Sequence, residues 1–300
     1  MKAIVYAQHG GPEVLRLEDV EEPHAGPGQV RLKVMAAGVN PVDYKIRNGW
    51  MPDMAPASWP AIPGLEAAGV VDEVGSGVTG VTVGDEVMAP TVTGSYAEYA
   101  LADDFALKPA GLSWQVAAAL PVALETADRV LDVLGVTAGE TLLVHGAAGP
   151  VGAFGVQLAV ARGVTVVGTA SPRNHDYLRS LGAIPVTYGD GLADRVWALA
   201  PQGIDAVFDA AGQSALDVSI ELRGGTERIV TIADVRAFEL GIVFSGSNRR
   251  FGAQLADYAQ LVADNALGVR VAESFALADS GRAHELSETG HAGGKVVLVP

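Results

Sequence analysis

The chain has 300 residues, enough for two domains of roughly 100 to 150 residues each, and its 49% hydrophobic against 18% charged residues exclude a disordered chain. Its formal net charge is -15, and because binding to a phosphate backbone requires clustered cations, no nucleic acid partner is expected. The absence of cysteine excludes disulfides, a thiol nucleophile and every zinc site built on thiolates.

The N-terminal sequence MKAIVYAQHGG lacks the apolar stretch that a signal peptide requires. The most apolar window, residues 151–170, is interrupted by Gln157, Arg162 and several glycines, which indicates a buried helix and strand rather than a membrane span. We therefore expect a cytoplasmic protein without a transmembrane segment or a membrane partner.

Short β-like runs, separated by turn clusters such as Pro27-Gly28, occupy the N-terminal part of the chain. Their spacing is typical of a small, mostly antiparallel barrel or sandwich. The runs are Lys2–Tyr6, Gln29–Ala37, Ala67–Val74, Glu86–Ala89 and Tyr96–Leu101.

From about Ser113 the pattern changes to helices that alternate with apolar strands, which predicts a parallel sheet with helices on both faces. After Asn248 we expect a helix through Ala266, a run to Phe275, a short helix and a last strand at Lys295–Val299. The strands of the parallel sheet are Thr141–His145, Val164–Thr169, Ile184–Tyr188, Ile204–Asp209 and Arg228–Ile232.

A glycine-rich turn, Gly146 to Gly152, joins the first of these strands to a helical stretch. Such a turn places the free amides of a helix N-terminus against a pyrophosphate. It departs from the pattern GxGxxG because Ala147 stands at the first glycine, whereas Gly149 allows close approach of a cofactor and Gly152 allows close packing of helix on strand. A tight strand–helix turn without a ligand is the alternative, and Pro150 suits both.

The choice of cofactor follows from the end of the next strand, where NAD-binding domains carry a carboxylate for the ribose 2′-hydroxyl. Residues 169–174, TASPRN, contain none. Ser171 can donate a hydrogen bond and Arg173 can pair with a 2′-phosphate, so NADPH fits better than NADH. An ordinary exposed residue at a helix start is the alternative for Arg173.

The histidines show neither an i, i+4 pair nor the pattern HExxH, so we predict no metal site. Without cysteine, any metal would depend on histidine and carboxylate ligands. The histidines are His9, His24, His145, His175, His284 and His291.

Several separated motifs carry a family resemblance that extends almost from end to end. They are AAGVNPVD at 36–43, PGLEAAG at 63–69, VGDEV at 83–87, the turn at 145–152 and GHAGGKVVL at 290–298. The chain resembles the medium-chain dehydrogenase/reductase superfamily, in its zinc-independent, quinone oxidoreductase-like branch. The resemblance implies an α/β fold with a GroES-like, β-rich catalytic domain at 1–112 and 250–300 and a Rossmann, doubly wound parallel-sheet domain for NADPH at 113–249.

The resemblance also implies a reaction. Zinc alcohol dehydrogenases of this superfamily carry a cysteine shortly after the glycine of the first motif and a histidine before the glutamate of the second. This chain has Asn40 to Asp43 and Leu65 there. Without a Lewis acid, reduction of a quinone or of the conjugated C=C bond of an enone or enal is favoured, because the conjugation of the substrate holds the charge that hydride leaves.

The position of residues within the family implies a cofactor site. Asn40, which we also expect to be catalytic, and Thr126 would lie near the nicotinamide, and Ser171, Arg173 and Tyr188 around the 2′-phosphate. The full cofactor-binding set is Asn40, Thr126, Ala148, Gly149, Pro150, Val151, Thr169, Ser171, Arg173, Tyr188, Ala210, Ala211, Ile232 and Ala233.

The proton that completes a reduction would come from Tyr44 or from water. Related enoyl reductases place a tyrosine after the glycine equivalent to Gly49, where this chain has Trp50, and Tyr44 is equally suited to a packing role. We expect Tyr44, Trp50 and Phe244 to bind a small-molecule substrate. The loop Trp50–Trp59 would form an apolar rim of the substrate site or a plain surface loop.

Two other functions remain open: a biosynthetic enoyl reductase for a polyketide-type or carrier-bound intermediate, and a non-enzymatic NADPH-binding sensor. The resemblance further implies a homodimer, since members of this branch commonly pair through the edge of the Rossmann sheet.

Overall fold

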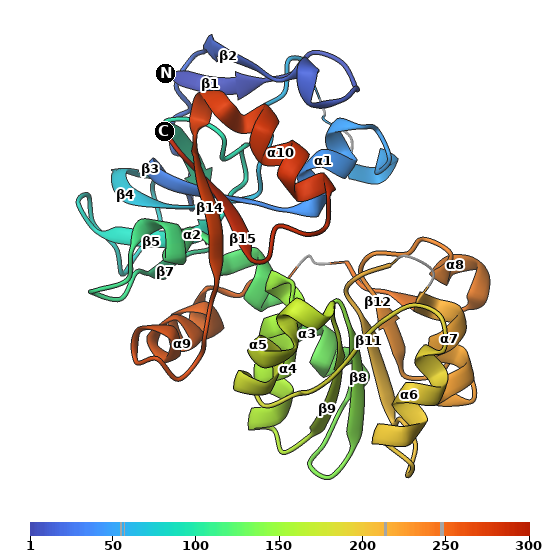
Figure 1. The fold of residues 1–300 in the computed structure, drawn as a ribbon. Helices are drawn as coiled ribbons and strands as arrows, with labels where there is room; N and C mark the ends of the chain where they lie inside the picture. The colour runs from blue at the N-terminus through green and yellow to red at the C-terminus, as the bar shows by residue number, and fades with distance from the viewer. Residues whose placement is uncertain (55, 57, 213–214, 247–248) are drawn as a thin grey trace. The chain divides into compact units, whose positions relative to one another are not determined.

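The computed structural model describes residues 1–54, 56, 58–212, 215–246 and 249–300. The chain forms two compact units: unit 1 is Met1–Val122 with Arg250–Pro300, and unit 2 is Ala123–Arg249 (Figure 1). No helix in the described part of the chain is both long and apolar enough to cross a membrane.

Unit 1 is built on a mostly antiparallel sheet, as its alternating β-runs predict. In the described residues this sheet has seven strands in the order β14-β15-β3-β4-β5-β7, and β6 also pairs with β3. A separate hairpin joins β1 (Lys2–Val5) and β2 (Arg16–Asp19). The seven strands are β3 (Val30–Val39), β4 (Glu66–Val74), β5 (Glu86–Pro90), β6 (Tyr99–Ala102), β7 (Ala106–Leu107), β14 (Val271–Ala276) and β15 (Lys295–Val299).

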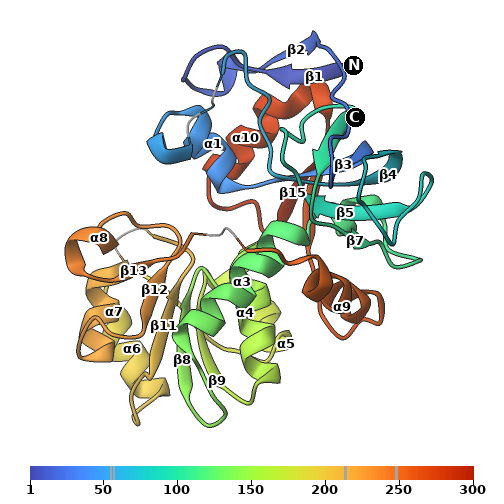
Figure 2. The ribbon, with the colours of Figure 1, turned by 180° about the vertical axis from the view of Figure 1, so that it is seen from behind.

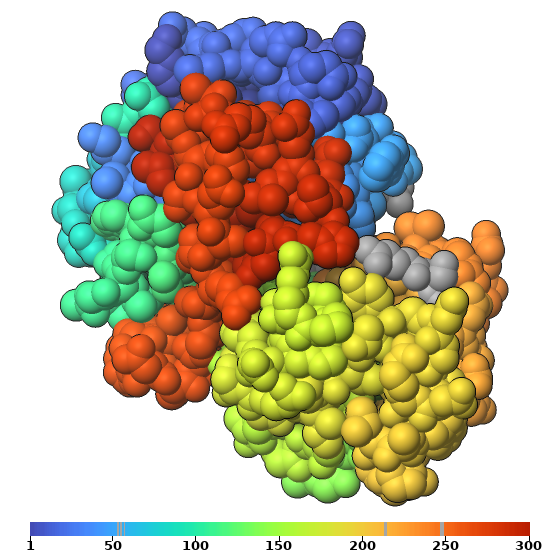
Figure 3. Space-filling view, in the orientation of Figure 1, coloured from blue at the N-terminus to red at the C-terminus, as the bar shows by residue number. Residues whose placement is uncertain are grey.

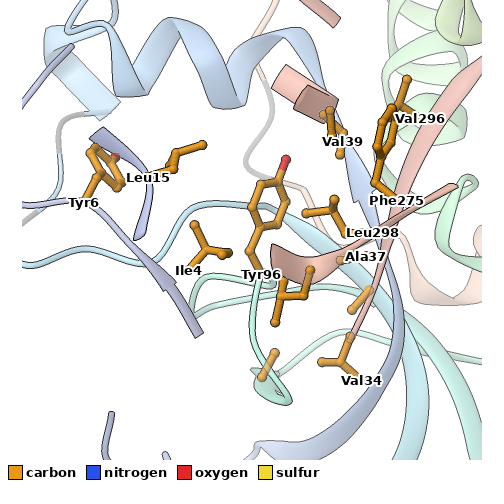
Figure 4. Packing of buried hydrophobic residues seen from close by; sticks show 14 residues of the cluster. Ile4, Tyr6, Leu15, Val34, Ala37, Val39, Tyr96, Phe275, Val296 and Leu298 are labelled. Carbon is orange, nitrogen blue, oxygen red and sulfur yellow. The ribbon is translucent and has the colours of Figure 1, made fainter. Parts of the chain in front are cut away.

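The last strands of the chain complete the sheet that β3 begins. β15 runs antiparallel to β3 with Val297 opposite Gly38, and β14 runs parallel to β15. On the face drawn in Figure 3 the C-terminal residues, in red, lie beside the N-terminal residues, in dark blue. Figure 4 shows the shared core, in which Ile4, Tyr96 and Leu298 come from the beginning, middle and end of the chain.

Short helices cover this sheet, and the first boundary between the two compact units falls later in the chain than the predicted domain boundary. Residues 113–122, which the sequence boundary assigned to the Rossmann domain, belong to unit 1, because α2 packs against β3 and β4. The second boundary falls between Arg249 and Arg250. The helices of unit 1 are α1 (Pro41–Arg47), α2 (Trp114–Ala118), α9 (Gly252–Ala263) and α10 (Ser280–Glu288), with single 3-10 turns at Pro12–Val14, Pro52–Met54 and Leu277–Asp279.

Unit 2 contains the predicted parallel sheet. Its described strands follow the order β10-β9-β8-β11-β12-β13, the doubly wound order of a Rossmann domain. The strands are β8 (Thr141–His145), β9 (Thr165–Thr169), β10 (Ile184–Val186), β11 (Ala206–Asp209), β12 (Ile229–Thr231) and β13 (Val243–Phe244), and all neighbours are parallel. Buried apolar runs such as TLLVH in β8 form these strands because helices cover both faces of the sheet.

The crossover helices of unit 2 divide between the two faces of its sheet. The strand order changes direction after β10, so right-handed crossovers place α4 and α5 on one face and α6 and α7 on the other, as Figures 1 and 2 show. The helices are α3 (Pro121–Leu134), which begins in unit 1, α4 (Pro150–Ala161), α5 (His175–Ser180), α6 (Leu192–Leu199), α7 (Ala215–Arg223) and α8 (Ala237–Leu240), with a 3-10 turn at Pro172–Asn174.

Candidate functional site

The glycine-rich turn of unit 2 lies at the carboxyl end of β8, where parallel sheets bind ligands. Gly146 adopts φ +68° and donates its N–H to Thr169 Oγ1 at 3.2 Å, which ties the turn to the end of β9. Gly149 is the N-cap of α4 and has no side chain to cap the helix, and Pro150 begins the first turn. The first amides of α4 are therefore left for an anion.

Position 152 requires a glycine because the backbone of the same turn leaves no room for a Cβ atom there. A Cβ atom at this position would lie 2.3 Å from Gly146 O and 2.8 Å from Ala147 Cα. A Cβ at Gly149 would meet only Gly146 O, at 3.3 Å. Close packing of α4 on the turn thus depends on Gly152, as the sequence predicts.

The residues expected at the 2′-phosphate lie just beyond β9 and β10. Ser171 is the N-cap of the turn Pro172–Asn174 and accepts a hydrogen bond from Asn174 Nδ2 at 3.3 Å, while Arg173 in that turn is exposed. Tyr188 was expected within a strand, but β10 ends at Val186, and Tyr188 lies exposed in the following loop.

Arg195, which the sequence reading missed, organises the loop that carries Tyr188. Its guanidinium donates to the carbonyl oxygens of Thr187 and Asp190 at 2.8 to 3.1 Å and of Tyr188 and Gly189 at 3.4 and 3.1 Å. The available signal was a cation one turn into a helix that follows a glycine-rich loop, which is too common a pattern to single out.

A buried carboxylate shapes the two loops expected along the inner face of the cofactor. Asp209 Oδ1 accepts the N–H groups of Ala211 and Gly212 at 3.0 and 2.9 Å, and Oδ2 accepts the Thr231 hydroxyl at 2.7 Å. Thr231 Oγ1 in turn accepts the N–H of Ala233 at 3.0 Å. Burial raises the pKa of Asp209 above its ordinary value.

These contacts gather most of the predicted cofactor residues at one edge of the sheet. Strands β8, β11 and β12 are neighbours and parallel, so the loops after them lie at the same edge. The loops hold Ala148, Gly149, Ala210, Ala211, Ile232 and Ala233, and the first turn of α4 holds Pro150 and Val151. Sequence reasoning found the loops and missed Asp209 and Thr231, which fix their conformation.

Thr126 and Phe244 lie outside these loops, although Phe244 pairs with Thr231 at the same end of the sheet. Thr126 is buried on α3. Phe244 belongs to the edge strand β13, and its ring stacks on Phe238 with centroids 5.4 Å apart, so its proposed contact with substrate stays a prediction. Asn248 lies outside the described residues.

His145, the last residue of β8, is buried as a neutral ring. Ser219 donates its hydroxyl proton to Ala215 O at 2.6 Å, so His145 Nε2 must donate to Ser219 Oγ, 3.0 Å away. Burial lowers the pKa of His145 to about 4 from 6.5.

The lowered pKa of His145 predicts a pH dependence of stability. Between these two pKa values the unfolded chain binds a proton that the folded chain does not, so stability falls as pH drops from 6.5 towards 4. Between about pH 7.5 and about pH 5, wild type should lose about 2 kcal/mol more than His145→Gln, whose amide can still donate to Ser219. Urea unfolding at both pH values measures this difference, and equal losses would contradict it.

Unit 1 holds a buried triad of Asn40, Glu66 and Lys295, from the end of β3, the start of β4 and the start of β15. Asn40 Nδ2 donates to Glu66 Oε1 at 2.8 Å, and Lys295 Nζ donates to Asn40 Oδ1 at 2.6 Å and to Glu66 Oε1 at 2.5 Å. The residues are 5%, 0% and 1% exposed. The sequence pointed to Asn40, whereas the charged partners were missed.

A second buried network begins at Asp43, three residues after Asn40. Tyr96 donates its hydroxyl to Asp43 Oδ2 at 2.8 Å and lies 3.1 Å from His284 Nε2. Arg47 can only donate, so His284 accepts it through Nδ1 at 2.9 Å and donates through Nε2 to Tyr96. Arg47 also donates to Glu288 Oε1 at 2.5 Å, which connects the network to the surface.

Burial favours the neutral forms of Asp43, His284 and Tyr96 in this network, whereas the equally buried Arg47 pairs with Glu288 towards the surface. Burial raises the pKa of Asp43 to about 7, and its Oδ1 has no partner in the described part of the chain. Burial, with Arg47 adding to it, lowers the pKa of His284 to about 3. Burial and the nearby Asp43 raise the pKa of Tyr96 well above its usual range.

Tyr44 and Trp50, expected at the substrate, lie together on α1 and the loop after it. Their rings meet edge to face with centroids 6.3 Å apart, and Trp50 is 64% exposed. Burial, with a smaller effect of Glu288, raises the pKa of Tyr44. Tyr44 therefore keeps its proton at neutral pH. Within the loop Trp50–Trp59, residues 55 and 57 lie outside the described part.

The predicted site residues thus divide between the units. Asn40, Tyr44 and Trp50 belong to unit 1, and the remaining predicted residues belong to unit 2. Among the described residues no three His, Asp or Glu side chains group as a metal site would require.

The chain matches two family models, one described as "Alcohol dehydrogenase GroES-like domain" at residues 26–111 and one as "Zinc-binding dehydrogenase" at residues 181–298. It is 39% identical to the NADPH-dependent alkenal/one oxidoreductase, chloroplastic, of Arabidopsis thaliana, over 75% of this chain and 61% of that protein. The chain thus spans less than two thirds of the length of the plant relatives that it matches.

Other similarities extend over the whole chain. A quinone oxidoreductase of Pseudomonas aeruginosa is 33% identical over 100% of this chain and 99% of its own length. The solved structure of the quinone oxidoreductase from Coxiella burnetii superposes with a TM-score of 0.88 at 35% identity, over 100% of this chain and 99% of that one. The chain therefore belongs to the medium-chain dehydrogenase/reductase superfamily, among its quinone oxidoreductase-like members.

Proposed function

We propose that the protein is an NADPH-dependent oxidoreductase that transfers hydride, without zinc, to a quinone or to the conjugated C=C bond of an enone or enal. The observation that carries this proposal is the uncapped glycine turn at the carboxyl end of β8, beside a β9 end that offers Ser171 and Arg173 and no carboxylate. The names of the Arabidopsis and Pseudomonas relatives support the cofactor and the two acceptor classes.

The residues of unit 2 fit the proposed cofactor by the chemistry of their donors. The first amides of α4 would hold the pyrophosphate, and Arg173 would pair with the 2′-phosphate as a charged donor. Asp209 and Thr231 hold the neighbouring loops in position for the nicotinamide end. When bound, NADPH supplies the hydride.

The residues of unit 1 fit an acceptor that carries its own conjugation. Where zinc relatives have metal ligands, this chain has Asn40 in a buried triad and Leu65, so an acceptor would meet hydrogen-bond donors there. Tyr44, which keeps its proton at neutral pH, supports a protein proton donor, and water is the alternative.

NADPH oxidation measured with a panel of quinones, enals and enones tests this function. We expect turnover with at least one of these classes and none with simple saturated aldehydes. Tight NADPH binding without turnover of any acceptor would favour a sensor over an enzyme. One zinc ion per chain, retained against a chelator, would overturn the zinc-free part of the proposal.

Arg173→Ala is expected to weaken NADPH binding about tenfold and NADH binding less than about twofold, because only NADPH carries the 2′-phosphate. Titration of both cofactors by fluorescence measures the two dissociation constants. Arg179→Ala is the matched control, since Arg179 is also exposed, on the adjacent α5, and pairs with Asp176 at 2.6 Å. Equal losses for NADPH and NADH would remove Arg173 from the 2′-phosphate.

We also infer a homodimer through the edge of the unit 2 sheet. Strand β13 is an edge strand, so its outer backbone groups face away from β12. Exposed apolar residues surround it: Val235, Phe238 and Val243 are 59%, 72% and 49% exposed. A second copy of the same edge would pair with the strand and cover these side chains, which an isolated monomer leaves in water.

Light scattering coupled to gel filtration tests the dimer. Wild type is expected to have twice the mass of one chain, and Phe238→Glu should shift it towards one chain. Leu199→Glu, at an exposed apolar residue of α6, is the control and should leave the mass unchanged. A monomeric wild type would contradict the inference.

A further inference from the structure

Burying the triad Asn40–Glu66–Lys295 contributes less to the stability of the fold than apolar residues in its place would. Glu66 and Lys295 are both removed from water, and such a buried pair commonly adds no stability over apolar residues of similar volume. The structure makes room for it: a Cβ at Gly38 would lie 2.3 Å from Glu66 Oε1. A costly pair with space reserved for it indicates a task other than stability.

The charged partners allow Asn40 only one orientation of its amide. Lys295 can only donate and an ionised Glu66 can only accept, so Oδ1 of Asn40 must face Lys295 and Nδ2 must face Glu66. The other oxygen of Glu66 accepts the Val122 N–H at 2.8 Å, which keeps the carboxylate from turning. The orientation of the Asn40 amide is thus fixed by its hydrogen-bond partners as well as by packing.

Among the described residues, one donor of this amide has no partner. The Nδ2 group carries two hydrogens, and Glu66 takes one of them. Asn40 is also the most exposed member of the triad, at 5% against 0% and 1% for its partners. A bound molecule would therefore meet the triad through Asn40. The nearby Lys295 ammonium, which draws on Oδ1, strengthens the amide as a donor.

We propose that Glu66 and Lys295 are positioning residues that aim the second Nδ2 hydrogen of Asn40 at the carbonyl oxygen of the acceptor. This rests on the proposed reductase function. Hydride adds to the β-carbon of an enone, the C=C electron pair moves towards the carbonyl, and the oxygen becomes an enolate. Asn40 donates to that oxygen, and a proton from Tyr44 or from water then adds at the α-carbon to give the saturated ketone.

The expected effect follows from where the charge develops. A donor aimed at a forming oxyanion is worth about 10²- to 10³-fold in kcat. A donor whose orientation is lost contributes only part of that, so loss of positioning is expected to lower kcat by about 30-fold while acceptor KM and NADPH affinity change less than about threefold.

The double variant Glu66→Gln/Lys295→Met isolates this role. It removes both buried charges together, so no unpaired charge remains, and residue volumes are nearly kept. Because the Val122 N–H needs the glutamine oxygen, the glutamine NH2 group faces Asn40 and requires its Oδ1. The Asn40 amide therefore turns over, so its aim is lost while both side chains stay paired. Gly246→Ala is the control for differences in protein preparation and cofactor content. It adds a methyl group where no atom of the described residues lies within 4 Å.

The rate should be measured on a series of ring-substituted benzalacetones. A variant that stabilises the enolate less should depend more steeply on electron-withdrawing substituents, an effect that a purely structural role would not produce. A thermally stable double variant with kcat within threefold of wild type and the same substituent dependence would overturn the positioning role.

A second measurement separates this inference from the proposed function. In the ¹⁵N-labelled full chain with NADP⁺, the saturated ketone 4-phenyl-2-butanone should shift the Asn40 side-chain amide resonance in wild type and leave it in place in the double variant. No shift in wild type would overturn the inference whether or not the protein turns over enones. A wild type that shows the shift without turnover would contradict only the reductase function.

Discussion

Arg47→Met is expected to lower the free energy of unfolding of unit 1 by about 3–5 kcal/mol, the usual cost of removing one partner from a buried charged network. The Arg47 side chain is fully buried and donates to Gly10 O, His284 Nδ1 and Glu288 Oε1. Methionine fills part of the volume and satisfies none of these acceptors. The His284 ring would lose the donor that sets its tautomer, and with it the hydrogen bond to Tyr96.

The measurement must report on unit 1 alone, because a two-unit chain need not unfold in one step. Three of the four tryptophans, Trp50, Trp59 and Trp114, belong to unit 1, so a Trp197→Phe background makes fluorescence specific to it. Lys2→Met, which breaks the exposed ion pair with Asp19 in unit 1, is the control and should cost less than about 1 kcal/mol. A loss below about 1 kcal/mol for Arg47→Met would show that the network is not structural.

Gly152→Ala is expected to weaken NADPH binding at least about 100-fold, equivalent to about 2.7 kcal/mol. The added Cβ would overlap Gly146 O at 2.3 Å and Ala147 Cα at 2.8 Å, and neither is the end of a flexible side chain that could move aside. The turn itself must shift, and with it the amides that would hold the pyrophosphate.

Calorimetric titration with NADPH measures this loss, and circular dichroism shows whether the fold persists. Gly246→Ala is the matched control in the same unit, because a Cβ there meets no atom of the described residues within 4 Å. NADPH affinity within threefold of wild type in Gly152→Ala would mean that the turn is not the pyrophosphate site.

Local patterns predicted the fold well because a few consecutive residues are enough to specify each main element of unit 2. The run TLLVH followed by Gly149 and Gly152 specifies a buried strand, a tight turn and a helix without reference to the rest of the chain. The edge strand β13, only Val243–Phe244, was missed because two residues carry no measurable period.

The triad could be predicted only in part, because its members are far apart in sequence. Asn40 lies in a recognisable motif, but its partner Lys295 is 255 residues away, and a lysine at the start of a strand ordinarily faces water. Arg47 was missed for the same reason, since a basic residue in the last turn of a helix is usually an exposed one. Buried charges are determined by the partners that tertiary structure supplies, and local sequence does not reveal them.

The pairing of β15 with β3 also dictates an order of events during synthesis on the ribosome. The whole of unit 2 is synthesised before β14 and β15. One edge of β3 therefore stays without its neighbour β15 while more than half of the chain is translated. Domains generally fold as units as they emerge from the ribosome, and an unpaired strand edge can form hydrogen bonds with the wrong strand. Unit 2 can therefore fold first, and the chain gains Lys295, the residue proposed to orient Asn40, only after the whole of unit 2 has been made.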